Sequence, residues 1–155
     1  MVIPKELQIL AKHWQFCYSI PNRVFYDLRG ILKQEFIWFA AYLKLKSNKG
    51  AKTPGPDEDI IDLLTKKRIL ELRKAVLSNK FSQIEVRKIM IPKPVKLRPL
   101  GILSINDRLV QEVIRTILEP IYELNFSHLS RGFRLNRSCH TALKWVNTHM
   151  KDSIW

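Results

Sequence analysis

The sequence is short of cysteines, acidic residues and long apolar runs, and each shortage excludes a class of protein. No run of about 18 apolar residues is present, so no membrane-spanning helix is expected. The two cysteines, Cys17 and Cys139, are too few for a disulfide framework or a zinc site, and both are expected to be reduced. We predict no metal and no other cofactor, because the histidines show no ligand spacing: His13, His128, His140 and His149.

Targeting signals are also lacking at the N-terminus. The segment MVIPKELQILAKHW has no apolar signal-peptide core and no cleavage site, and it is not rich in Arg and Ser as a transit peptide would be. We therefore expect a protein that stays in the cytosol or is made inside the organelle where it works.

Positive charge is the strongest compositional signal. The chain has 27 Lys and Arg residues against 14 Asp and Glu residues, which gives a net charge of +13. Nucleic acid is the commonest polyanion bound by a folded basic domain. An anionic membrane surface is the weaker alternative, because the basic residues are spread over the chain rather than gathered on one amphipathic helix.

Apolar residues at three- and four-residue spacing predict an α+β fold that is mostly helical. One helix is expected over residues 5 to 18. A second is expected over residues 24 to 46, with Trp38 and Leu43 in its apolar face, where core packing is favoured over base stacking. A third, charged helix is expected over residues 60 to 80.

Residues 46 to 59 are predicted to form a loop, because they hold two glycines and two prolines among polar residues. Lys49 and Lys52 give this loop positive charge, so contact with nucleic acid is weighed against a solvated surface loop. Asp57 and Asp59 are expected at the start of the next helix, where they would suit its dipole.

Residues 84 to 90 and 97 to 103 are extended runs on either side of the basic turn PKPVK. The prolines deny hydrogen bonds to a neighbouring strand, so the pair is predicted to be a hairpin that lies at an edge and projects. Three side chains at its tip are suited to binding phosphate, with a solvated surface hairpin as the alternative: Lys93, Lys96 and Arg98.

The sequence SIND at residues 104 to 107 is a capping box, and it begins a helix that runs towards Pro120. Arg108 is placed to pair with Asp107 or Glu112, and the alternative is that it reaches RNA.

The sequence GFRLNRSCHTAL follows at residues 132 to 143. Arg134 and Arg137 offer guanidinium groups to phosphate, and Asn136 or Ser138 is placed to cap a last helix. That helix is expected to bury one stripe of side chains: Cys139, Leu143, Val146 and Met150.

The order of these parts resembles the fingers of a group II intron reverse transcriptase, a protein also called an intron maturase. The motifs that carry the resemblance are IPKPVKLRPLGI, INDRLVQ, LEPIYE and GFRLNRSCHTAL. It covers about residues 30 to 155, with residues 1 to 29 as a helical extension. Three positions depart from the family pattern: Glu58 replaces a glycine, the hairpin is about one residue shorter, and Leu135 replaces a proline.

The resemblance implies roles for particular cations. In the family, the loop contacts the template, and the hairpin's Lys and Arg approach the nucleotide triphosphate. The matching hairpin residues here are Lys93 and Arg98, with Lys96 between them, and the shorter turn favours contact with RNA phosphate over contact with a nucleotide. The predicted RNA-binding set is therefore Lys49, Lys52, Lys93, Lys96, Arg98, Arg134 and Arg137.

The resemblance also implies that these residues are not an enzyme by themselves. Two-metal nucleotidyl transfer needs clustered carboxylates, and the family supplies them from positions beyond the matched segment. We predict a non-catalytic protein that binds structured RNA and supports intron splicing. The alternatives are a structural rRNA-binding component of a mitochondrial ribosome and the fingers half of a split reverse transcriptase that docks with a separate palm chain.

Partners and location follow from the same resemblance. Structured RNA, either an intron or rRNA, is the expected partner, together with other proteins of a ribonucleoprotein, and no membrane is expected. Mitochondrial and chloroplast introns encode such proteins, and we favour the mitochondrion.

Overall fold

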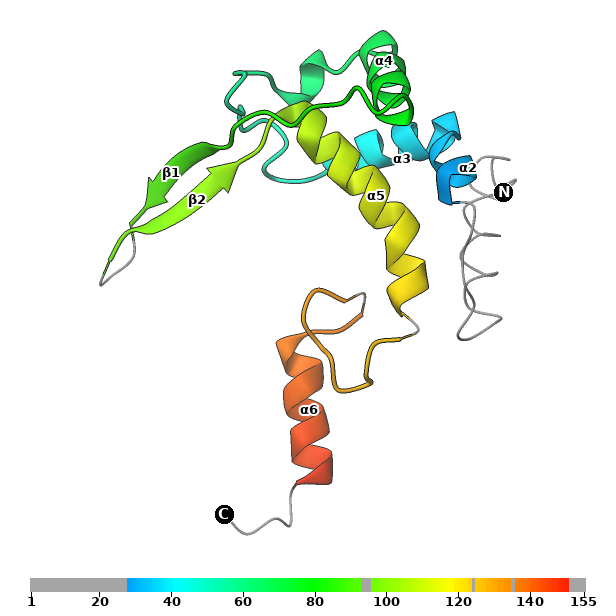
Figure 1. The fold of residues 1–155 in the computed structure, drawn as a ribbon. Helices are drawn as coiled ribbons and strands as arrows, with labels where there is room; N and C mark the ends of the chain where they lie inside the picture. Colours follow the sequence, from blue (N-terminus) through cyan, green and yellow to red (C-terminus); the bar gives the residue numbers. More distant parts are fainter. Residues whose placement is uncertain (1–27, 93–95, 124, 135, 151–155) are drawn as a thin grey trace.

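The computed structural model describes residues 28–92, 96–123, 125–134 and 136–150. The fold is α+β, as predicted: a body of several helices carries one antiparallel hairpin (Figure 1). The predicted helix over residues 5 to 18 lies outside the described residues, as does almost all of the extension over residues 1 to 29. In chain order the elements are α2 (Leu28–Leu32), α3 (Glu35–Lys46), the short 3-10 helix η1 (Ile61–Leu63), α4 (Lys66–Leu77), β1 (Arg87–Ile91), β2 (Arg98–Ile102), α5 (Ile105–Glu123) and α6 (Cys139–His149).

The core is formed where α3 packs against α5. Ile37 and Trp38 on α3 are fully buried, as are Leu109 and Val113 on α5. The prediction that Trp38 is a core residue is confirmed. The same prediction is wrong for Leu43, which is 64% exposed. Leu43 lies about 140° around the helix from Trp38, so it points away from α5.

The helix predicted over residues 24 to 46 is interrupted between α2 and α3, at Lys33 and Gln34. Side chains of α3 and α4 satisfy the carbonyl groups that the interruption leaves without helical partners. The Trp38 indole donates to the Leu32 carbonyl at 2.9 Å, and the Arg73 guanidinium donates to the Lys33 carbonyl. The break therefore costs no buried hydrogen bond at these two groups.

Helix α4 begins later than predicted, at Lys66 rather than near residue 60. Its N-cap is Thr65, whose hydroxyl accepts from the backbone N–H of Arg68. The expected dipole contact is wrong, because α4 has no acidic residue in its first turn. Asp59 instead forms an ion pair with Arg68 at 2.6 Å.

The hairpin projects from the helical body, as predicted (Figure 1). Strands β1 and β2 pair antiparallel, with Ile89 opposite Leu100. Most of the hairpin is exposed, and Ile102 is buried where β2 meets the body. A Cβ on Gly101 would lie 2.7 Å from the side chain of Val86, so the absence of a side chain lets the two strands come together at the base.

Helix α5 begins as the capping box predicts. The Ser104 hydroxyl accepts from the backbone N–H of Asp107 at 3.1 Å and donates to its carboxylate at 2.6 Å. Pro120 lies inside α5 near its C-terminal end and is also buried. Within the described ranges, none of the helices combines the length and the apolar character needed to cross a membrane.

Helix α6 begins at the predicted place, and Ser138 caps it by accepting from the backbone N–H of Thr141. The predicted burial of its apolar stripe is wrong in this structure. Leu143 is 66% exposed, and Cys139, Val146 and Met150 are also exposed. The four side chains share one face, as the spacing predicted, but the described part of the chain does not cover that face.

Glu58 adopts the backbone conformation that a glycine would favour. Its φ is 58°, in the left-handed region, and its N–H donates to the carbonyl of Gly55 at 3.3 Å. Replacing the family's glycine with glutamate therefore leaves a tight turn in place. The cost is backbone strain of about 1 kcal/mol.

We expect Glu58→Gly to raise the free energy of unfolding by about 0.5–1 kcal/mol, because glycine adopts a positive φ without strain. Chemical denaturation with urea measures it. Glu71→Gly is the matched control, since it makes the same chemical change inside α4, where glycine should lower stability by about 1 kcal/mol. Equal destabilisation by both variants would contradict strain at residue 58.

Candidate nucleic-acid interface

The basic loop between α3 and η1 presents its lysines to solvent. Lys49 and Lys52 are both exposed, while Ala51 between them is buried in the core. Lys52 lies 3.9 Å from Asp62, but its side chain is 81% exposed, so this ion pair leaves the ammonium group accessible. The loop is thus anchored at Ala51 and directs its flanking charges outward.

Arg108 anchors the same loop to the start of α5. Its Nε donates to the carbonyl of Leu103 at 2.9 Å, and its Nη2 donates to the carbonyl of Thr53 at 2.9 Å. A longer contact of 3.4 Å reaches the carbonyl of Gly50. The predicted pairing of Arg108 with Asp107 or Glu112 is therefore wrong. The loop carbonyls are better placed for the planar guanidinium.

The hairpin carries the second group of predicted cations. Lys96 and Arg98 are exposed, and Arg98 pairs across the ladder with Ile91, next to the tip. Lys88 on β1 is exposed as well. Lys93 lies outside the described residues. The hairpin thus presents positive charge along its length and towards its tip.

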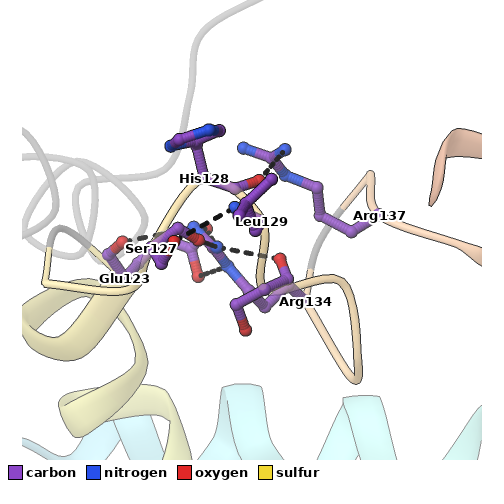
Figure 2. A network of polar contacts seen from close by, with 7 residues as sticks. Glu123, Ser127, His128, Leu129, Arg134 and Arg137 are labelled. Atoms are coloured by element: carbon purple, nitrogen blue, oxygen red, sulfur yellow. Dashed lines mark hydrogen bonds and ion pairs between the residues drawn. The ribbon is translucent and has the colours of Figure 1, made fainter. Parts of the chain in front are cut away.

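Arg134 is enclosed, unlike the hairpin cations. Its side chain is 8% exposed and lies 2.7 Å from the Glu123 carboxylate, with a second contact from Nε at 3.0 Å. The remaining Nη1 group donates to the carbonyls of Ser127 and Ser130 at 2.8 and 3.0 Å. Figure 2 shows that these bonds close the loop after α5 upon the end of that helix.

Arg137 reaches back across the same loop, and its Nη1 donates to the carbonyl of His128 at 3.2 Å (Figure 2). Arg134 and Arg137 are therefore both engaged within the protein, and Arg134 is the more enclosed of the two. Their contact with RNA stays a prediction.

The predicted cations do not gather at one site. Lys49 and Lys52 lie on the loop that is held at the start of α5, close to where β2 leads into that helix (Figure 1). Arg134 and Arg137 lie beyond the other end of α5. Helix α5 spans residues 105 to 123, which corresponds to about 28 Å. Among the described residues, no group of three His, Cys, Asp or Glu side chains is placed to hold a metal ion.

A four-residue ion network lies between these two ends. Glu112 is 3.4 Å from Lys44 and 2.7 Å from Arg115, and Arg115 also contacts Glu119 at 3.1 Å. Partial burial acts to raise the pKa of Glu112, but hydrogen bonds and charge from Arg115 and Lys44 outweigh it and lower that pKa. The hydrogen bond to Glu112 in turn raises the pKa of Arg115.

Two aromatic features were not predicted from the sequence. The rings of Trp145 and His149 on α6 are stacked at 4.5 Å, and His128 lies 6.4 Å from Trp145. Phe133 has a φ of 56° and a fully exposed side chain. The four-residue spacing of Trp145 and His149 on a helix is a signal from which the first feature could have been predicted, whereas a positive φ at a phenylalanine has no sequence signal.

Several of the known proteins to which the chain is similar have names that refer to introns. The chain is 39% identical over 136 residues to the group II intron-encoded protein LtrA of Lactococcus lactis subsp. cremoris, a match that covers 86% of the chain and 23% of LtrA. It is 41% identical over 128 residues to a 91 kDa protein in cob intron of Schizosaccharomyces pombe, covering 82% of the chain and 16% of that protein.

A plant relative extends the comparison. The chain is 28% identical over 165 aligned residues to nuclear intron maturase 2, mitochondrial, of Arabidopsis thaliana, covering 96% of the chain and 22% of the maturase. The chain thus spans about a quarter or less of each of these relatives. No protein-family model matches the sequence.

The lowered pKa of Glu112 predicts acid sensitivity. A carboxyl group whose pKa is lower in the folded state stabilises the fold above its ordinary pKa of 4.5 and loses that contribution as pH falls through the folded value. We expect the stability difference between wild type and Glu112→Gln to shrink between pH 7 and pH 3. Urea unfolding at several pH values measures it, with exposed Glu71→Gln as control. A difference that stays constant with pH would contradict the assignment.

Proposed function

This chain belongs to the family of group II intron-encoded proteins, and on that premise we propose that it binds structured RNA through its basic loop and hairpin. The relatives' names connect them with introns, and intron RNA is the partner proposed here. In this role the protein holds folded RNA in place and supports splicing.

The observation that carries the proposal is the exposure of the cations at one end of the molecule. Lys49, Lys52, Lys96 and Arg98 are all exposed, although the backbone that bears them is anchored by Ala51, Arg108 and Ile102. Exposed cations on a fixed backbone are suited to phosphates at fixed spacing, because little ordering is needed on binding. A projecting hairpin also reaches phosphates that a flat surface cannot.

We propose further that these 155 residues contribute RNA binding and not nucleotidyl transfer. Transfer by two metal ions needs several carboxylates on one site. Between Glu123 and Trp155 the sequence holds one acidic residue, Asp152. A primer-extension assay with Mg²⁺ tests this, and incorporation of nucleotides by the purified chain would contradict it.

RNA binding through the hairpin predicts a particular salt dependence. We expect the triple variant Lys88→Gln, Lys96→Gln, Arg98→Gln to weaken binding and to reduce the slope of log K against log salt concentration by about 2–3, since each lost phosphate contact removes about 0.7–0.9. Fluorescence anisotropy with a labelled intron RNA measures both quantities.

The matched control is Lys67→Gln, Lys74→Gln, Lys80→Gln on and after α4, at exposed positions. Both triple variants lower the net charge from +13 by 3, so a general charge effect would weaken both equally. Equal slopes for the two variants would show that the hairpin is not the interface.

A second candidate function has one observation in its favour. The face of α6 that bears Leu143, Val146 and Met150 is exposed, and an apolar stripe on a helix normally packs against another element. We propose as the alternative that this face docks with a catalytic palm domain, which would make the chain the fingers part of a reverse transcriptase. Proteins captured with the wild-type chain, but not with a Val146→Glu variant, would include such a palm.

Mitochondrial location is proposed from the Arabidopsis relative, whose name places it there, although LtrA is bacterial.

Crosslinking of the tagged protein to RNA in its own cells, followed by sequencing, identifies the RNA partner. We expect reads concentrated on an intron. Reads at one rRNA site, with co-sedimentation in a ribosomal subunit, would favour the ribosomal alternative instead.

A further inference from the structure

Phe133 combines two unfavourable features. Its φ of 56° lies in the left-handed region, which costs energy for any residue with a bulky side chain. Its side chain has 110% of the reference accessible area, so the described structure offers the ring no cover. An apolar ring kept exposed on a strained backbone is typical of a ligand contact, because strain of this kind gathers at binding sites.

The backbone around Phe133 is held in this conformation by its neighbour. Arg134 binds the Glu123 carboxylate at 2.7 Å and the Ser127 carbonyl at 2.8 Å, and its guanidinium lies 5.2 Å from the centre of the Phe126 ring (Figure 2). The position of residue 133 is therefore fixed relative to the end of α5. From this backbone the ring is presented to solvent.

A cavity of about 310 Å³ lies beside this ring. Its aromatic lining consists of Tyr122, Phe126 and Phe133, and its charged lining includes the ion pair between Arg115 and Glu119. The volume lies near the lower end of the range for small-molecule sites, so it suits a group of one or two rings. Tyr122 and Phe126 are themselves about half exposed, so the lining is accessible.

We propose that this cavity receives one unpaired nucleobase of a bound RNA, with Phe133 as the stacking surface. The inference rests on the proposed RNA-binding function and names the part of the RNA that this end of the molecule contacts. Aromatic rings and guanidinium planes are the groups on which unpaired bases stack. Glu119 and Glu123 also line the cavity, and their carboxylates can accept from the amino groups on base edges.

The test uses the opposite effects of one substitution on binding and on stability. Glycine adopts a φ of 56° without strain, so Phe133→Gly should keep or raise the melting temperature of the full chain. The same variant should bind a labelled single-stranded RNA of about 12 nucleotides roughly tenfold more weakly, because a stacking surface is lost. Binding to a blunt RNA duplex of about 16 base pairs should not change, because its bases are already stacked.

Two further variants complete the design. Phe133→Trp should keep the affinity for single-stranded RNA, and Leu43→Ala removes another exposed apolar side chain, on α3, as a control. If Phe133→Gly does not fold, Tyr122→Leu on the last turn of α5 replaces it, with the same expected loss.

The outcomes separate this inference from the proposed function. Unchanged single-strand affinity in Phe133→Gly, or an equal loss on the duplex, overturns the base site while leaving RNA binding intact. A change in self-association or protein capture, with RNA affinity unchanged, also overturns it and indicates a protein ligand. If the wild type binds neither RNA at any salt concentration, the proposed function itself fails.

Discussion

The packing of α3 against α5 is the contact on which the other parts depend. Trp38 and Val113 are buried in it, and α5 runs from Ile105, which belongs to the same core, to Glu123. At the start of α5, Arg108 holds the basic loop, and the chain passes from β2 into the helix. At its end, Glu123 holds Arg134. Both groups of predicted cations therefore take their positions from one helix, and a change in how α5 sits on α3 would move both.

Sequence patterns predicted the elements better than their packing. The capping box at Ser104, the paired strands and the start of α6 are local features, and local hydrogen bonds determine them. At the interruption, Arg73 donates to the Lys33 carbonyl from 40 residues away. Helix α4 starts at Lys66, where Thr65 caps it. Contacts between residues about forty positions apart leave no mark in local spacing.

The arginines illustrate a second limit of prediction from the sequence. Arg98, Arg108 and Arg134 look alike in the sequence, yet Arg98 is exposed while the other two bind backbone carbonyls or a carboxylate. Which role an arginine takes depends on whether carbonyls lie within reach of its planar group after folding. The sequence therefore does not separate the arginines that hold the loops from those that are exposed.

The hairpin is joined to the body at one end, where Ile102 is buried and Gly101 allows Val86 to approach closely. Its paired strands make it stiff, and each five-residue strand spans about 17 Å. A rotation of the hairpin by about 10° at its base would therefore displace its tip by about 3 Å. Arg98, which lies next to the tip, would move with it, while the core between α3 and α5 stays unchanged.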